Sequence, residues 1–264
     1  MYPEFFYKYR SISKKFDEIA DDHAIQALFK SYGNFSGRKN FNDLFDSKID
    51  LAKPTPQQFK ALRNHIHKAQ KHIFDGLTKS GKFTQAGHGH LNDLEQMFNE
   101  LIDSYAVYSL SAKATSNLMW AHYADSHRGF CIEFRSQYIQ ALPVTYSDNI
   151  AKLEMIDLFR LQLSTVDENE LGKKVVAALR VKLKEWSYED EYRYLANDEN
   201  SRIPAGKLRK EVYYQPEFVE AIIFGCRMEE RVKRYIIQNM PYPVKYKQAQ
   251  EGMSTVNIVD SDLA

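Results

Sequence analysis

Two acidic residues and an arginine occupy alternate positions late in the chain, within the stretch Lys184 to Leu195. If this stretch is a strand, Glu189, Glu191 and Arg193 share one face, because side chains alternate along an extended backbone. The other face is almost wholly aromatic. Neighbouring carboxylates repel each other unless something cationic is bound beside them. The pattern therefore predicts either a binding site or an edge strand with a charged, solvated face.

Two earlier segments carry polar side chains that suit the same site. Arg10 lies near the end of an aromatic segment, residues 5–12, which is predicted as the first strand. A guanidinium there can reach a phosphate or carboxylate in a cleft, although a surface arginine or an ion pair with a neighbouring strand explains it equally well. Ser109 and Ser111 lie two apart in a predicted strand over 105–111, so their hydroxyls share a face.

Ring-bearing residues follow the serine pair in a short amphipathic helix predicted over 118–124. Trp120, His122 and Tyr123 could stack on a flat ligand. Packing of the helix on the sheet accounts for Trp120 equally well.

A turn is predicted over residues 41–46, since Asn and Asp bond their own backbone and favour bends. Its acidic groups could line a site, but an ordered Asx turn is the simpler interpretation.

His65 and His72 share a helix face without a clear third ligand, so we expect solvated histidines and no metal centre.

The composition favours a soluble cytoplasmic protein. The chain has 36 Lys and Arg against 35 Asp and Glu, a net charge of +1, so a nucleic-acid or membrane partner would need a local charged patch. No apolar run is long enough to span a bilayer. Cys131 and Cys226 lie in separate apolar runs and are expected to be buried thiols, which suits a reducing compartment.

The order of the elements predicts an α+β fold with a mostly antiparallel sheet, in one domain over 1–264 with a helical insertion at about 54–104. Further strands are expected at 130–134, 143–146, 211–214, 219–225 and 243–246. Helices are expected at 57–79, 91–104, 150–164, 168–184 and 228–239.

Several of these motifs resemble a bacterial family of unassigned function, the DUF2971 family. The resemblance rests on residues 7–10, 41–46, 109–111, 118–134, 184–193 and 221–225. The family usually has proline where this chain has Leu44, which relaxes the turn without touching the expected site.

The order of an arginine, a Ser-x-Ser strand and a Glu-x-Glu segment also resembles ADP-ribosyltransferases. That resemblance implies a split sheet, two packed antiparallel layers enclosing a cleft for NAD as substrate. It implies Glu191 as the catalytic carboxylate and Glu189 as the group that steers the acceptor. Arg10 and Tyr9 would hold the cofactor, Ser109 and Ser111 would order its nicotinamide half, and Trp120, His122 or Tyr123 would cover the ring.

The function expected on this basis is transfer of ADP-ribose from NAD to DNA, RNA or protein, as in a bacterial toxin or anti-phage effector with an antitoxin or regulatory partner. Hydrolysis of NAD without an acceptor is a related possibility. Two other classes stay open: a non-catalytic nucleotide-binding module, and a metal-dependent nuclease or hydrolase. The last would use Asp43, Asp46, Glu189 and Glu191.

Overall fold

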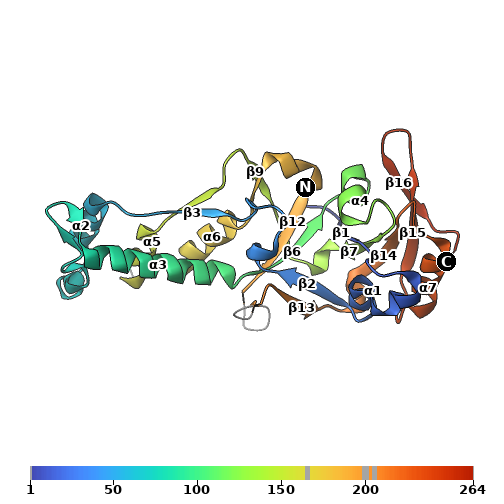
Figure 1. Ribbon diagram of the computed structural model, residues 1–264, viewed down its shortest axis with the longest axis horizontal. Helices are drawn as coiled ribbons and strands as arrows, with labels where there is room; N and C mark the ends of the chain where they lie inside the picture. The colour runs from blue at the N-terminus through green and yellow to red at the C-terminus, as the bar shows by residue number, and fades with distance from the viewer. Residues whose placement is uncertain (1, 164–166, 198–201, 204–206, 264) are drawn as a thin grey trace.

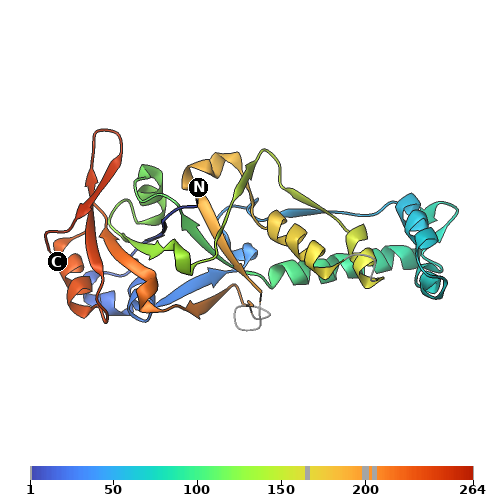
Figure 2. The same ribbon diagram turned by 180° about the vertical axis from the view of Figure 1, so that it is seen from behind.

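A computed structural model describes residues 2–163, 167–197, 202–203 and 207–263. The molecule is elongated, with a large sheet at one end and a helical arm at the other (Figure 1). The reverse view shows the same division, with the chain's C-terminus at the end of the molecule farthest from the arm (Figure 2). No helix within the described ranges has the length and apolarity needed to cross a membrane.

The sheet has ten strands, and its neighbours run antiparallel except for the parallel pair β14 and β15. This confirms the expected mixed fold with a large, mostly antiparallel sheet. Along the sheet the strands are β13 (Arg209–Tyr213), β2 (Tyr32–Ser36), β6 (Ala106–Ser111), β1 (Phe5–Arg10), β7 (Phe130–Arg135), β14 (Val219–Phe224), β15 (Lys245–Glu251) and β16 (Val256–Asp260), with β12 (Glu191–Ala196) beside β6 and β8 (Leu142–Pro143) beside β12.

Helices cover both faces of this sheet. On one face α1 (His23–Phe29) and α7 (Glu230–Asn239) bury Ile25 and Ile236. On the other, α4 (Asn117–Tyr123) buries Trp120. The central strands β7 and β14 are buried on both faces, which explains their continuous apolar runs.

The sheet divides at β6. One edge of β6 pairs with β12 over six residues, whereas the other edge meets β2 only at Val107 and β1 only at Ser111. Among the described residues, no strand pairs with the backbone between those two points on that edge. This opening lies next to the ends of β6 and β12 that carry Ser111 and Glu191.

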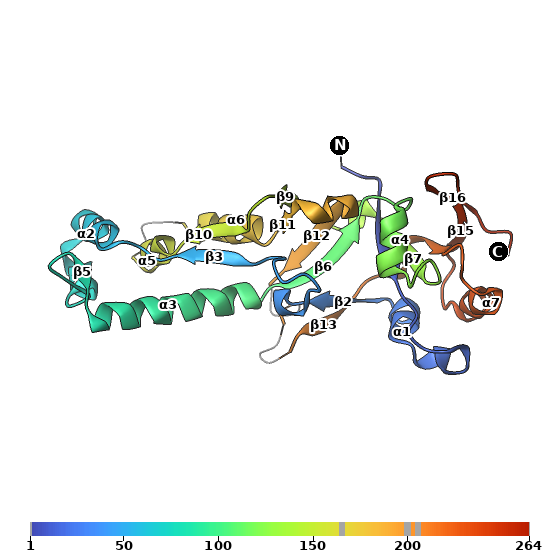
Figure 3. The ribbon, with the colours of Figure 1, turned by 45° about the horizontal axis from the view of Figure 1, so that its top comes forward.

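The arm has its own apolar core and a long spine, α3 (Gln85–Asp103), seen along its whole length in Figure 3. Phe59, Phe98 and Phe159 meet in this core. The arm includes elements of the segment 54–104 and also takes in a second segment, because α5 (Ile156–Gln162) and α6 (Glu168–Ala178) pack onto the same core. The other elements of the arm are β3 (Ile49–Ala52), α2 (Pro56–His65), η3 (Lys68–Phe74), β4 (Thr78–Lys79), β5 (Lys82–Phe83) and β10 (Ala151–Glu154).

Three sequence expectations for the second half need correction. The strand expected over 184–195 begins only at Glu191, because residues 184–189 form the 3-10 helix η5 (Lys184–Glu189). The helix expected over 150–164 starts with strand β10, which pairs with β3; Ser164 itself lies outside the described residues. The helix expected over 168–184 ends at Ala178, and β11 (Val181–Leu183) then pairs with β9 (Thr145–Ser147).

Four short 3-10 helices complete the described elements: η1 (Phe16–Asp21), η2 (Arg38–Asn40), η4 (Ser136–Tyr138) and η6 (Pro216–Phe218). Cys131 and Cys226 are both free thiols; the first is buried, as expected, whereas the second is only half-buried.

Candidate functional site

A cavity of about 100 Å³ lies where β1, the end of β6 and α4 meet the turn at residues 41–46. Both serines and both glutamates singled out from the sequence line it. Its wall consists of Tyr7, Lys8, Tyr9, Phe41, Asn42, Asp46, Ser109, Leu110, Ser111, Met119, Tyr123, Lys182, Glu189 and Glu191.

The two glutamates reach the cavity through a tight change of backbone direction. Glu189 ends η5, Asp190 adopts a left-handed conformation (φ 42°), and Glu191 begins β12. Asp and Asn tolerate this conformation better than most residues do. Residue 191 then pairs with Ser111, and Arg193 pairs with Ser109, so the polar row of β12 lies beside the hydroxyl row of β6.

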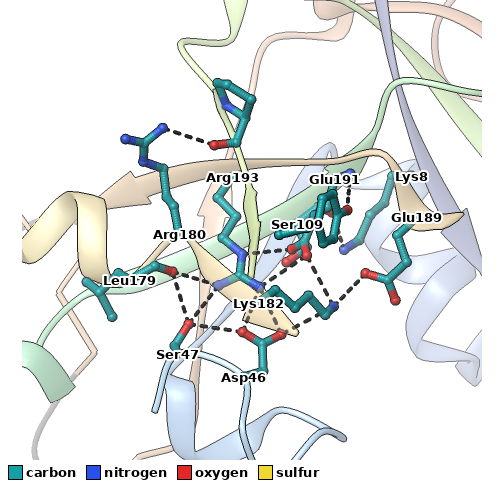
Figure 4. Close-up of polar contacts among 12 residues, drawn as sticks. Lys8, Asp46, Ser47, Ser109, Leu179, Arg180, Lys182, Glu189, Glu191 and Arg193 are labelled. Carbon is teal, nitrogen blue, oxygen red and sulfur yellow. Dashed lines mark hydrogen bonds and ion pairs between the residues drawn. The ribbon is translucent and has the colours of Figure 1, made fainter. Parts of the chain in front are cut away.

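A lysine ammonium occupies the point at which three carboxylates converge (Figure 4). Lys182 Nζ lies 2.5 Å from Glu189 Oε2, 3.2 Å from Glu191 Oε2 and 3.3 Å from Asp46 Oδ2. All four side chains are at most 5% exposed. The cation that the paired glutamates require is thus supplied by the chain itself, from β11.

Arg193 provides the second buried cation. Its side chain is 0% exposed. The guanidinium donates from Nε to Glu191 Oε1 at 2.9 Å and from Nη2 to both oxygens of Asp46, at 2.7 and 2.8 Å. It also donates from Nη1 to Ser47 Oγ and Leu179 O, each at 2.6 Å. The planar guanidinium therefore links three parts of the chain by hydrogen bonds: the 41–47 segment, the residue that follows α6, and β12.

The charges of this cluster shift the pKa values of the two glutamates in opposite directions. Burial opposes ionisation of Glu191, but Arg193 and Lys182 outweigh it and lower the pKa of Glu191 to about 2. Burial, with the charge of Glu191, raises the pKa of Glu189 despite its contact with Lys182. Paired carboxyl groups with separated pKa values are typical of sites in which one acid stays ionised and the other exchanges a proton.

A third cation, Lys8, lies in the opening of the sheet. Lys8 Nζ donates to Ser109 O at 2.7 Å, on the edge of β6 that no strand closes, and lies 4.6 Å from the centre of the Tyr108 ring. Burial, together with the charge of Arg10, lowers the pKa of Lys8 to about 8, and the two glutamates oppose this shift. The cavity thus holds three carboxylates, two cations that are paired with them, and a third cation, Lys8, whose pKa is about 8.

The hydroxyl groups around the cavity hold the glutamates in place. Ser111 Oγ donates to the backbone oxygen of Glu189 at 2.7 Å, and Ser109 bonds the side chain of Glu191. Tyr123 donates its phenol to Glu189 Oε1 at 2.5 Å, and burial beside that carboxylate raises the pKa of Tyr123. Tyr9 lines the wall with its ring while its hydroxyl donates to Lys113 O at 2.6 Å.

Three residues expected at the site do not line the cavity. Arg10 points to the face of the sheet that carries Phe6, where its charge acts on tyrosines of the other core. Trp120 is fully buried in the core beneath α4 and donates Nε1 to Ala114 O, so helix packing is its role. His122 is exposed, with its ring 6.0 Å from that of Tyr188.

No group of three or more His, Cys, Asp or Glu within the described ranges has the geometry of a metal site. Lys182 already occupies the position between Asp46, Glu189 and Glu191. Asp43 does not line the cavity, and its Oδ1 accepts from Phe45 N at 2.9 Å, as expected for an Asx turn.

Sequence reasoning missed Lys182 and Lys8 as members of the site. The requirement for a cation beside the glutamates was a usable signal for Lys182, which precedes Glu189 by seven residues. The assignment of residue 182 to a helix concealed that signal. Asp46 appeared only in the metal-dependent alternative, and its true partners are two cations of the chain.

Comparison with known proteins identifies one family. No curated protein and no solved structure matches the chain significantly. The model of one family matches residues 119–194, a range that contains most of α4 and all of β7, together with Lys182, both glutamates and Arg193. The resemblance expected from the sequence is therefore confirmed over this part of the chain, which matches DUF2971, described as a protein of unknown function.

Proposed function

We propose that the cavity cleaves the bond between ribose and nicotinamide in NAD and passes ADP-ribose to a macromolecular acceptor. The observation that carries this proposal is a glutamate, Glu191, which stays ionised while it is almost sealed from water and bonded to Ser109 in the cavity wall. A fixed carboxylate in a dry site stabilises a neighbouring positive charge far better than water does.

The reaction would develop positive charge where Glu191 can act on it. The C1′–N bond breaks with both electrons leaving on nicotinamide, so the charge of the pyridinium ring moves to the ribose as an oxocarbenium ion. Glu191 stabilises that ion. An acceptor hydroxyl or amine, or water, then forms a bond to C1′ and loses a proton.

Glu189 suits the task of receiving that proton. Its pKa is raised, and Tyr123 and Lys182 fix its two oxygens. A base whose pKa lies closer to neutrality accepts a proton more effectively than one that is always ionised. The acceptor would therefore approach from the side of Tyr123 and α4.

The anionic part of NAD needs a cation, and Lys8 replaces Arg10 in this role. Lys8 lines the cavity and is the one lining cation, among the described residues, that no carboxylate holds within ion-pair distance. A cavity of about 100 Å³ is much smaller than the usual pocket for a whole drug-sized ligand, so the adenosine end of NAD would stay outside it.

The likeness to the ADP-ribosyltransferase fold is part of the same proposal. What supports it is the division of the sheet at β6, directly beside the cavity. Unregulated loss of NAD would stop growth, which is the basis for the expected toxin or defence role and for an antitoxin partner.

The test is release of nicotinamide when the purified protein is incubated with NAD, followed by chromatography. We expect release by the wild-type protein and its loss in Glu191→Gln, because the amide carries no charge. Glu185→Gln is the matched control, since Glu185 is exposed in the same segment. Thermal melts of both variants establish that they are folded.

Two results would overturn the proposal. One is saturable NAD binding with no nicotinamide released, which identifies a binding module. The other is equal turnover by folded Glu191→Gln and wild-type protein. Toxicity on expression in bacteria, relieved by Glu191→Gln, tests the effector role separately.

A further inference from the structure

The end of the arm concentrates positive charge that the rest of the chain lacks. We define the tip as residues 56–90, which include α2, η3, β4, β5 and the first residues of α3 (Figure 3). The tip has six Lys and Arg and one Asp, a net charge of +5. Because the whole chain carries +1, the remaining residues carry −4.

Most of this charge is not neutralised within the tip. Arg63 pairs with Asp75 at 3.1 Å. In the part of the chain that the structure describes, the five lysines of the tip form no ion pair. Four of them are exposed and Lys71 is half-buried: the five are Lys60, Lys68, Lys71, Lys79 and Lys82.

The lysines come from three consecutive elements and so spread over an extended surface. Lys60 lies on α2, Lys68 and Lys71 on η3, and Lys79 and Lys82 on the β4–β5 hairpin. A single small anion would engage one or two of them at most. A polymer with regularly spaced negative charges would engage several together.

The chemistry of the tip favours nucleic acid over a lipid surface. Proteins that bind at a membrane interface place large apolar side chains among the acyl chains, beside the basic residues. Every large apolar residue that is well exposed in the described chain lies outside residues 56–90. The tip instead exposes Gln57, Gln58 and Asn64, whose amides can bond phosphates or bases.

We propose that the tip of the arm binds the phosphate backbone of nucleic acid. The contacts are phosphate contacts, so binding is mainly independent of sequence and strongly dependent on salt. The proposal goes beyond the reaction at the cavity, and its readout is binding alone. A protein that does not cleave NAD could still bind nucleic acid through the tip. Absence of nucleic-acid binding would likewise not contradict cleavage of NAD at the cavity.

The experiment measures fluorescence anisotropy of a labelled 20-base-pair DNA duplex and of a single-stranded RNA of equal length, across a salt series. Five phosphate contacts predict a slope of log K against log salt of about −4.5 for the duplex. We expect Lys60→Ala/Lys68→Ala/Lys79→Ala to reduce that slope by about 2.7, because three contacts are lost. All three side chains are exposed, so the variant should fold.

The matched control removes the same charge from the opposite end of the molecule. Lys14→Ala/Lys15→Ala/Lys30→Ala alters three exposed lysines of the α1 region, and we expect its slope to stay at the wild-type value. An equal effect of both triple variants would overturn the proposal, since it would indicate a general charge effect. Absence of binding to both nucleic acids, or binding only to vesicles that contain phosphatidylserine, would also overturn it.

Discussion

Replacing Arg193 by methionine removes a buried cation and keeps most of its aliphatic volume. Among the described residues, the three carboxylates of Asp46, Glu189 and Glu191 would then keep Lys182 as their one ion-pair partner. Removing one partner of a buried ion pair costs about 3–5 kcal/mol, because the other charge is left uncompensated. Whole domains are stable by only about 5–15 kcal/mol.

We therefore expect Arg193→Met to lower the free energy of unfolding by about 4 kcal/mol, measured by urea denaturation at pH 7. The melting temperature should fall by roughly 8 °C for a chain of this size. A loss below about 1 kcal/mol would refute the reasoning, since the usual cost of an exposed ion pair lies in that range.

A second substitution tests the charge balance itself. In the wild-type protein Asp46→Asn removes a negative charge and one of the two oxygens that accept from Arg193, and it should cost about 1–2 kcal/mol. In the Arg193→Met protein the same change removes an uncompensated negative charge, so it should stabilise. If Asp46→Asn costs the same in both proteins, the two residues are not coupled and our account of the cluster is wrong.

The pKa of Glu191 is about 2 in the folded protein, which is below its value in the unfolded chain. Ionised Glu191 therefore contributes about 3 kcal/mol to the free energy of unfolding. This contribution is present above pH 4.5 and is lost as the pH falls towards 2. Urea unfolding at pH 7 and pH 3 should show a smaller loss in Glu191→Gln than in wild type. Lys8, with a pKa of about 8, loses its charge above that pH, so the KM for NAD should rise between pH 7 and 9. Lys8→Met should have a raised KM that no longer varies over this range; an unchanged KM would exclude Lys8 as the phosphate partner. A Cβ on Gly129 would lie 2.1 Å from Arg10 O, so Gly129→Ala should cost about 1–3 kcal/mol in thermal melts. Gly89→Ala, in an open helical position, is its control and should stabilise by up to about 1 kcal/mol; destabilisation by both to the same extent would contradict the steric explanation.

The sheet was largely predictable because its strands show clear local patterns. The strands β1, β6, β7 and β14 lie within a residue or two of the expected ranges, since alternation or a continuous apolar run marks them. Residues 184–189 were wrongly predicted as part of a strand, because their aromatic residues also occupy alternate positions. Only the left-handed Asp190 separates that 3-10 helix from β12, and one such residue has no signature in sequence periodicity.

The site was predictable in its two glutamates, its serine hydroxyls and Arg193, but not in its two lysines. Strand periodicity places Ser109 and Ser111 on one face of their strand, and the register of the pairing then sets Glu191 beside Ser111 and Arg193 beside Ser109. The pairing of Asp46 with Arg193 joins residues 147 positions apart, and such a contact depends on tertiary packing. Alternation along β1 places Arg10 on the face that carries Phe6, and Arg10 does not line the cavity, whereas Tyr7 and Tyr9 on the other face do.

The arm and the sheet have separate apolar cores, which would ordinarily let each melt at its own temperature. Arg193 is anchored in β12 of the sheet, yet it donates to Leu179 O, in a residue of the arm's core. Loss of the arm alone would leave this guanidinium without several acceptors in a dry environment. We therefore expect calorimetry to record one cooperative transition for the whole chain.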